Sequence, residues 1–220
     1  MIGNIKGAIF DMDGTLIDSL CLWDVLWEAF GKRYLGRDGF RPSDDAEKAI
    51  RTMTLKDTME MIHKTYALGE SGAALLEAAN EVIRDFYARA VQCKPGVREF
   101  LEYCKENGIK MCIVSATGPK LLQTAIEHCE LGSYFSDVLS CGKIGKGKDQ
   151  PDIYLAALGH LGTPKEETCV FDDSLVAIET AHKLGLRTVA VYDRYNYSQE
   201  EMRAIADAYI ADGETLLKLI

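Results

Sequence analysis

The sequence lacks a long hydrophobic run: no apolar stretch approaches the roughly 18 residues that a membrane-spanning helix needs. It also lacks a basic and apolar leader, because the N-terminus passes directly into a short strand-like segment. Basic residues are fewer than acidic ones, 25 against 34, and the formal net charge is −9. This charge argues against binding nucleic acid or an anionic membrane through bulk electrostatics. We therefore expect a cytoplasmic protein that binds neither.

Closely spaced cysteine pairs are missing as well. Seven cysteines are scattered along the chain, an odd number with no Cys-x-x-Cys pair to indicate a zinc site or a redox centre. The pattern is typical of small, buried, apolar residues in a reducing compartment. The sequence also contains no internal repeat and no low-complexity segment. Its 220 residues, 47% of them hydrophobic, suffice for one large domain or a core with a smaller unit.

Two hydrophobic patterns divide the chain. From 20 to 90 the apolar residues follow helical spacing, which predicts helices over about 20–35, 44–51, 55–66 and 72–90 and no strand. From Lys94 onward strands and helices alternate, which predicts a parallel sheet with crossover helices. After the first strand, which ends at Phe10, the predicted strands are 110–114, 137–140, 168–172, 187–191 and 208–210. The predicted helices run from Pro95 to about Asn107 and over 118–129, 151–161, 174–184 and 199–207, with a last helix at the C-terminus.

Two carboxylates follow the first strand. The apolar run Ala8-Ile9-Phe10 stops at Asp11-Met12-Asp13-Gly14-Thr15, and charges at the end of a buried strand are costly without a partner. Asp11 and Asp13 point the same way on an extended segment, and Gly14 permits a sharp turn. Because paired carboxylates repel, a divalent cation is a usual partner. For a lone segment of this kind, an ordinary Asp-Gly turn is the simpler interpretation.

Polar residues also follow two later strands. Ser115 ends the strand at 110–114 ahead of a helix, where a hydroxyl and backbone N–H groups can bind phosphate, although a serine there is often only a helix cap. Asp172 and Asp173 end the strand at 168–172. One aspartate is a natural helix cap, but two adjacent ones at this edge indicate a further role.

The loop before Pro151 contains three lysines, which by themselves are ordinary surface charges. Gly142 to Lys148 matches the first seven positions of a phosphate-binding P-loop. Asp149, however, stands where a Ser or Thr should hold magnesium, and the helix begins only at Pro151. The P-loop interpretation is therefore disfavoured.

Taken together, these segments resemble the four motifs of the haloacid dehalogenase (HAD) superfamily. Asp11 to Ser19 matches its first motif, Asp-x-Asp-Gly-Thr-hydrophobic-x-Asp-Ser, at every fixed position. The other matches are Ser115 for the second motif, with Thr117 as the weaker candidate, Lys148 in Lys-x-x-Pro-Asp-Ile-Tyr for the third, and Asp172-Asp173 for the fourth. The resemblance is to phosphatases with a C1 helical cap, in the beta-phosphoglucomutase and phosphoglycolate phosphatase-like subgroup.

For the fold, the resemblance implies an α/β protein with a Rossmann-like, doubly wound parallel sheet. The core would comprise 1–19 and 91–220, and 20–90 would form an all-helical C1 cap inserted after the first strand. The cap would supply substrate contacts, for which Trp23 and Arg51 are the candidates. We expect a monomer.

For the chemistry, the resemblance implies a Mg²⁺-dependent phosphatase that acts on a small phosphorylated metabolite through an aspartyl phosphate. Asp11 would be the nucleophile, and Asp13 the general acid and base. Ser115, Lys148 and Thr117 would bind the phosphoryl group. Mg²⁺ would be held by Asp11, by Asp13 through its backbone carbonyl, by Asp173 and by Asp172 as a secondary ligand.

The main alternative is a phosphosugar mutase of the beta-phosphoglucomutase type. Such mutases carry a cap-hinge histidine where this chain has Trp23, and an Arg-Gly loop where it has Arg51-Thr52, so both positions favour hydrolysis. Dehalogenases of the superfamily do not keep the acid that corresponds to Asp13. A phosphonate hydrolase would need a Schiff-base lysine, and the candidates in the insert, Lys32, Lys48, Lys56 and Lys64, lie in no recognisable setting.

Two non-enzymatic interpretations also exist. Signalling receivers likewise phosphorylate an aspartate in a doubly wound sheet, but they are shorter and lack a helical insert after the first strand. A catalytically silent binding protein is disfavoured because no motif residue is missing.

Overall fold

The computed structural model describes residues 5–50, 53 and 55–220. The chain divides into two compact units. The first, here called the core unit, contains the chain up to Leu20 and again Val91–Ile220. The second, the helical unit, is Cys21–Ala90. Each unit is described by itself.

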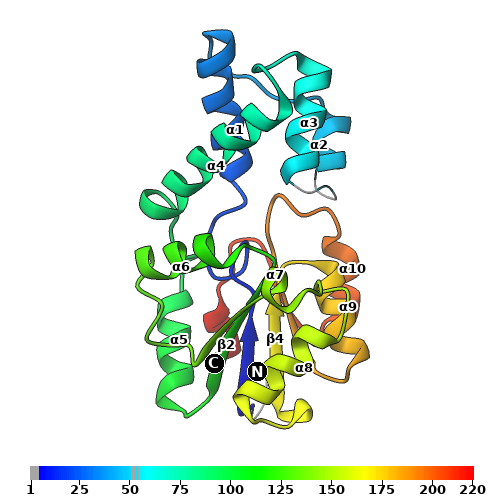
Figure 1. Cartoon of the computed structure of the whole chain (residues 1–220). Helices are drawn as coiled ribbons and strands as arrows, with labels where there is room; N and C mark the ends of the chain where they lie inside the picture. The colour runs from blue at the N-terminus through cyan, green and yellow to red at the C-terminus, as the bar shows by residue number, and fades with distance from the viewer. Residues whose placement is uncertain (1–4, 51–52, 54) are drawn as a thin grey trace. The chain divides into compact units, whose positions relative to one another are not determined.

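The core unit contains a six-stranded parallel sheet in the order β3-β2-β1-β4-β5-β6. Figure 1 shows β1, in blue, between β2 and β4. The predicted parallel α/β sheet is confirmed. The strands are β1 (Gly7–Phe10), β2 (Lys110–Ser115), β3 (Asp137–Ser140), β4 (Thr168–Asp172), β5 (Arg187–Val191) and β6 (Ala208–Ile210).

The register of the sheet brings the ends of three strands level. Phe10, the last residue of β1, pairs with Ile113 of β2 and Phe171 of β4. Residues that follow these three positions therefore reach the same carboxyl edge of the sheet, where open α/β sheets bind ligands. The order in which strands are added changes side at β1, since β2 and β3 lie on one side of it and β4 to β6 on the other.

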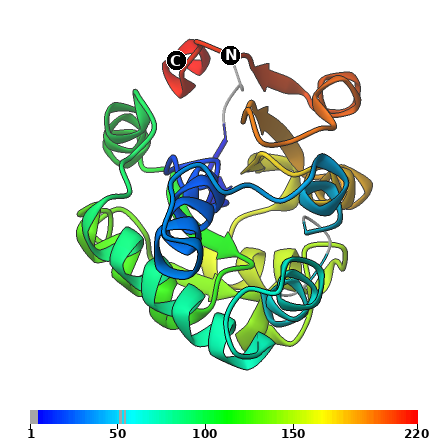
Figure 2. The ribbon, with the colours of Figure 1, turned by 90° about the horizontal axis from the view of Figure 1, so that it is seen from above.

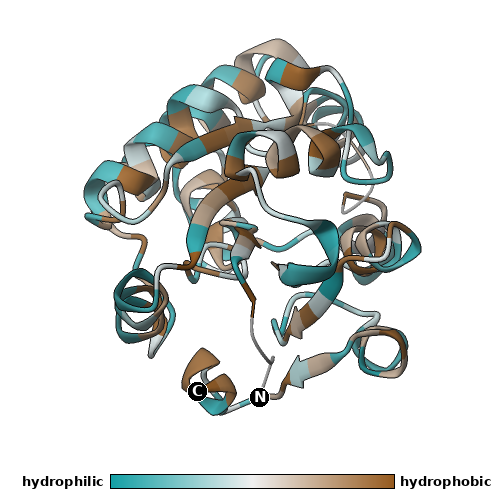
Figure 3. Ribbon diagram, turned by 90° about the horizontal axis from the view of Figure 1, so that it is seen from below, coloured by the Kyte–Doolittle hydropathy of each residue, from teal (hydrophilic) through white to brown (hydrophobic). Residues whose placement is uncertain are grey.

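Helices cover both faces of the sheet. Ile9 and Val170 pack with Ile153 and Tyr154 of α8 and with Ala181 of α9 on one face. The core-unit helices are α5 (Val97–Glu106), α6 (Pro119–His128), α7 (Cys141–Ile144), α8 (Asp152–Leu161), α9 (Leu175–Lys183) and α10 (Gln199–Ile205), with 3₁₀ turns η2 (Lys165–Glu167) and η3 (Leu216–Leu219). In Figure 3 the strands carry mostly hydrophobic, brown residues.

On the opposite face of the sheet, aromatic side chains of β1, β4 and α5 form a cluster. Phe10 stacks on Phe171 with ring centroids 4.5 Å apart, and Phe100 of α5 meets Phe171 edge-on at 5.6 Å. Because successive residues of a strand point to opposite faces, Phe10 and Ile9 fill the two different halves of the core. η3, drawn in red in Figure 2, contacts α5 and so adds to this face.

Two predicted elements of the core unit were wrong in detail, and one short helix was not predicted. α5 begins at Val97 rather than at Pro95, because Gly96 adopts a left-handed conformation with φ 76°. A Cβ at position 96 would also lie 2.9 Å from Cβ of Thr215. A side chain there would therefore clash with Thr215, which is a second reason for glycine. The last helix is only the 3₁₀ turn η3, and the Gly- and Lys-rich loop contains one helical turn, α7, that the sequence did not predict.

The helical unit contains no strand among its described residues, as predicted. Its helices are α1 (Leu22–Phe30), α2 (Asp44–Ile50), α3 (Leu55–Tyr66) and α4 (Gly72–Arg89). α1 continues as a π-helical segment, η1 (Gly31–Leu35), where a Cβ at Gly31 would lie 2.9 Å from Cβ of Phe40. Among the residues described in either unit, no helix combines the length and the hydrophobicity needed to span a membrane.

The aromatic cluster gives a test of the packing. Phe100→Ala removes a fully buried ring, and we expect it to lower the free energy of unfolding by about 3–5 kcal/mol. Tyr103→Ala, in the same helix but 38% exposed, should cost less than about 1 kcal/mol. Urea denaturation of the two variants measures both values. Equal losses would contradict the packing described here.

Candidate active site

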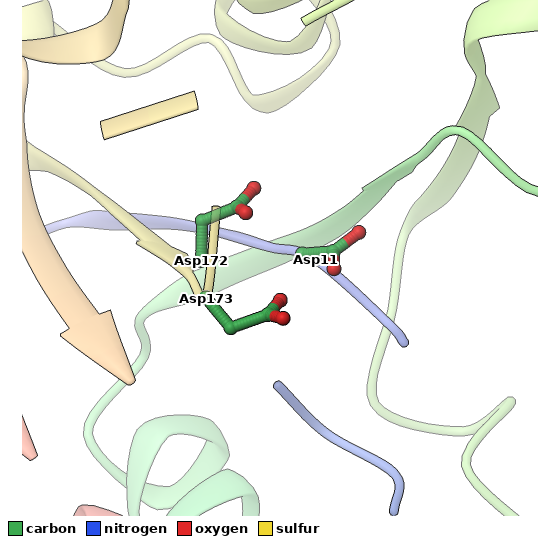
Figure 4. Close-up of side chains that lie close together, drawn as sticks. All are labelled: Asp11, Asp172 and Asp173. Carbon is green, nitrogen blue, oxygen red and sulfur yellow. The ribbon is translucent and has the colours of Figure 1, made fainter. Parts of the chain in front are cut away.

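Three buried aspartates meet at the carboxyl edge of the sheet. Asp11 directly follows β1, Asp172 ends β4 and Asp173 follows it, so two neighbouring strands supply them (Figure 4). One carboxylate oxygen from each lies within 4.8 Å of the others. The backbone N–H of Asp11 donates to Phe171 O at 2.8 Å, which continues the sheet pairing to the site itself.

Lys148 neutralises part of this charge. Its Nζ lies 2.5 Å from Asp11 Oδ1 and 2.7 Å from Asp172 Oδ2; both carboxylates are buried, and the lysine side chain is 11% exposed. Burial alone would lower the pKa of Lys148, but the two carboxylates raise it well above its usual range. The two carboxylates therefore favour the charged form of Lys148 and hold its ammonium group between the ends of β1 and β4.

The three acids still carry an excess of negative charge. Burial raises the pKa of Asp11 well above its ordinary value, and Lys148 opposes this rise while the neighbouring carboxylates add to it. Burial and Asp172 raise the pKa of Asp173 to about 7. Oxygen ligands gathered in this way suit a hard divalent cation, which would remove the repulsion. The donor set at this edge therefore fits a metal ion.

Asp13 has a different environment from Asp11. Ser19 Oγ donates to Asp13 Oδ1 at 2.7 Å, and Thr117 Oγ1 donates to Asp13 Oδ2 at 2.6 Å. These two hydroxyls fix the orientation of the carboxylate. The Asp13 carboxylate is not part of the group of three described acids, and its role as a ligand through the backbone carbonyl stays a prediction.

The second motif lies at the end of β2. Ser115 is buried, and its Oγ accepts a hydrogen bond from the Thr117 N–H at 3.0 Å. Ser140 Oγ, from the end of β3, donates to Thr117 O at 2.9 Å. The backbone of Thr117 is thus held on both sides while its hydroxyl reaches Asp13. Thr117 stays a predicted substrate contact, but the contact that the structure shows is with the predicted general acid.

Asn196 was missed by the sequence analysis. Its Nδ2 donates to the backbone carbonyl of Asp173 at 2.7 Å and to Asp173 Oδ2 at 2.5 Å. Thr15 Oγ1 donates to the other oxygen, Asp173 Oδ1, at 3.0 Å. Asn196 lies in the loop after β5, and β5 is the neighbour of β4 in the sheet. A polar residue in that loop was the sequence signal that could have pointed to it. It lies five residues beyond the strand end, in no motif.

A buried ion pair supports the loop that carries Asn196. Lys94 Nζ lies 3.0 Å from Asp193 Oδ2 and donates to Tyr192 O at 2.9 Å. Lys94 and Asp193 also line a cavity of 620 Å³ together with Thr15 and other residues. Asp11, Ser115 and Lys148 are not among the lining residues, so this cavity lies beside the acidic cluster and not in it.

The two predicted substrate contacts of the insert belong to the helical unit. Trp23 lies in α1 and stacks on Trp27 with ring centroids 5.5 Å apart. Arg51, with Thr52 of the mutase comparison, lies outside the described residues. Their roles stay predictions.

Comparison with known proteins identifies the family. Residues 8–191 match the family model described as haloacid dehalogenase-like hydrolase. The chain is a haloacid dehalogenase-like hydrolase. The family predicted from the four motifs is confirmed, and so is the prediction that the protein is an enzyme.

This haloacid dehalogenase-like hydrolase is similar over most of its length to proteins named as phosphatases. It is 25% identical to a phosphorylated carbohydrates phosphatase of Thermotoga maritima, with 96% of this chain and 97% of the relative covered. It is 29% identical to hexitol phosphatase B of Escherichia coli, with 85% and 83% covered. A solved structure from T. maritima, provisionally assigned as a beta-phosphoglucomutase, superposes with a TM-score of 0.84 at 24% identity and covers 98% of both chains.

The charge balance of the site predicts a large cost for removing its lysine. Lys148→Met leaves buried carboxylates unpaired, and we expect it to lower the free energy of unfolding of the metal-free protein by about 3 kcal/mol. Lys146→Met, an exposed position in the same loop, should change it by less than about 0.5 kcal/mol. Denaturant unfolding in the presence of a chelator measures the difference. A Lys148 variant as stable as the Lys146 variant would contradict the ion-pair assignment.

Proposed function

We propose that this protein is a Mg²⁺-dependent phosphatase that hydrolyses a small phosphate monoester through an aspartyl phosphate on Asp11. The observation that carries the proposal is the convergence of Asp11, Asp172 and Asp173 from two strand ends around Lys148. Similarity to proteins named as phosphatases supports it, as does membership of the hydrolase family.

Asp11 is the proposed nucleophile. A carboxylate oxygen attacks phosphorus, the new P–O bond forms, and the bond from phosphorus to the alcohol oxygen breaks. Lys148, 2.5 Å from Asp11 Oδ1, favours the ionised form of Asp11 against the effects of burial. The register that sets Phe10 beside Phe171 fixes the backbone immediately before Asp11, so the attacking group is held by the sheet.

Asp13 is the proposed general acid and base. In the first step it gives a proton to the departing alcohol, and in the second it takes one from the water that attacks the aspartyl phosphate. Ser19 and Thr117 hold its two oxygens in place. Because Asp13 lies two residues after Asp11 on the same segment, one loop sets the geometry of both groups.

Asp11, Asp173 and the backbone carbonyl of Asp13 would hold Mg²⁺, with Asp172 as a secondary ligand. When bound, the ion would offset the repulsion between the carboxylates and an incoming phosphate. Thr15 and Asn196 orient Asp173 for this role. Lys148 and the Ser115 hydroxyl are the proposed ligands of the phosphoryl oxygens, with the Thr117 segment beside them.

For the substrate, we propose a phosphorylated sugar or polyol. The similar proteins named above act, by their names, on phosphorylated carbohydrates and on hexitol phosphates. The helical unit would act as the cap, with Trp23 and Arg51 as its predicted substrate contacts. The phosphosugar mutase stays the alternative, and Trp23 at the position of the mutase histidine still favours hydrolysis. A cytoplasmic monomer is proposed.

The nucleophile is tested by an isosteric substitution. We expect Asp11→Asn to lower turnover of p-nitrophenyl phosphate by about 10³-fold or more, because an amide oxygen cannot form the intermediate. Glu179→Gln, which neutralises an exposed acid of α9, should stay within about twofold of the wild type. Release of inorganic phosphate is measured with Mg²⁺ and after chelation, which should abolish it reversibly. Activity in the chelated protein, or in the Asp11 variant, would contradict the proposal.

Asn196 is tested through the metal. Removing both of its hydrogen bonds in Asn196→Ala should raise the Mg²⁺ concentration for half-maximal activity by about tenfold, since groups that orient ligands tune metal affinity on this scale. The Mg²⁺-induced rise in melting temperature should need a similarly higher concentration. Asn107→Ala, which alters an exposed amide at the end of α5, is the matched control and should leave both values unchanged. An Asn196 variant that behaves like the Asn107 variant would refute the positioning role.

A further inference from the structure

Two cysteines that are far apart in sequence are neighbours in the core unit. Cys93 lies on the segment before α5, and Cys129 caps the end of α6. Both line the same small pocket, next to Arg98. The Cys129 thiol donates to Val91 O at 3.9 Å, two residues before Cys93. The fold therefore brings the two cysteines to one pocket from positions 36 residues apart in sequence.

The surroundings of the two thiols make them chemically unequal. The Cys129 thiol, with help from Arg98, lowers the pKa of Cys93 to about 7 although burial opposes the shift. The Cys93 thiol, with burial, raises the pKa of Cys129 well above its usual range. Arg98 is fixed beside the pair, because its Nη2 donates to Cys129 O at 2.5 Å. Of the two thiols, Cys93 is therefore the one whose ionised form is favoured.

Solvent can reach this pair through a cavity. Cys93, Cys129 and Arg98 line a pocket of 340 Å³, together with His128, Glu99 and residues 91, 92 and 94. Cys93 is half-buried, whereas Cys129 is buried beneath it. A small oxidant would therefore meet Cys93 first. A low-pKa thiol that is reachable and lies next to a second thiol has the arrangement of an oxidisable site.

We propose that Cys93 and Cys129 form a reversible dithiol–disulfide site, which a hydroperoxide oxidises through Cys93. The Cys93 sulfur attacks the peroxide, an S–O bond forms, the O–O bond breaks, and the leaving oxygen takes up a proton, which gives a sulfenic acid. The Cys129 sulfur then attacks Cys93, the S–S bond forms, the S–O bond breaks, and water leaves with the Cys129 proton. The two sulfurs lose two electrons in total and the peroxide gains them.

The site lies beside the loop that carries the catalytic acids. The residues that flank Cys93 pair with the first loop: Asp18 N–H donates to Gln92 O at 2.9 Å, and Lys94 N–H donates to Leu16 O at 2.9 Å. α6, whose last residue precedes Cys129, begins just after the segment that contains Thr117. The disulfide would therefore link two segments covalently: the one that pairs with the loop containing Asp13, and the helix that follows Thr117, whose hydroxyl donates to Asp13.

The test uses the full-length, reduced protein and hydrogen peroxide. We expect the intact mass to fall by two hydrogens, a non-reduced peptide map to link Cys93 to Cys129, and dithiothreitol to reverse the change. Cys93→Ser should form no disulfide. Cys129→Ser should instead accumulate a sulfenic acid on Cys93 that dimedone labels, which tests the nucleophile independently if Cys93→Ser folds poorly. Circular dichroism of each variant verifies folding.

Reactivity before oxidation gives a second test. At pH 7 iodoacetamide should alkylate Cys93 about fivefold or more faster than Cys141, because Cys141 is equally half-buried but burial raises its pKa. Peptide mapping against time measures both rates. The proposal is overturned if peroxide links other cysteines or separate chains instead, or if Cys93 reacts no faster than Cys141.

Discussion

The structure depends on holding three buried carboxylates next to one another at the end of two adjacent strands. Repulsion and burial both raise the pKa of Asp11, and the pKa of Asp173 rises to about 7. Lys148 offsets part of the charge, and its position between the ends of β1 and β4 constrains the loop before α8. The remaining excess of negative charge is what makes the cluster suited to a divalent cation, and an incoming phosphate would otherwise be repelled.

Sheet topology explains why the cluster forms where it does. β1 is central, and the strand order changes side there, with β2 on one side and β4 on the other. Loops from neighbouring strands diverge at such a point and leave room for a ligand. Each neighbour of β1 supplies one function: β2 leads to the Ser115 and Thr117 segment, and β4 leads to the two further acids. A third loop, after β5, reaches back to Asp173 through Asn196.

Sequence reasoning found the strands and the motif residues because both are local signals. Apolar runs that end in acids mark strand ends, and matching motifs at four strand ends predict which residues converge. It could not find Asn196 or the Cys93–Cys129 pair, because both depend on contacts between segments that are distant in sequence. The scattered cysteines were interpreted as inert core residues for the same reason. The start of α5 was misplaced because Gly96, not Pro95, decides it through its left-handed backbone and its close approach to Thr215.

The account stands on one divalent cation held by acids from two strand ends. Isothermal titration of the metal-free protein with Mn²⁺, a spectroscopically useful substitute for Mg²⁺, measures this directly. We expect a single site per chain that is lost in Asp173→Asn and retained in Glu179→Gln, because only the first variant removes a member of the cluster. Titration curves for Asp173→Asn that match the wild type, or a wild type that binds no ion, would contradict the account.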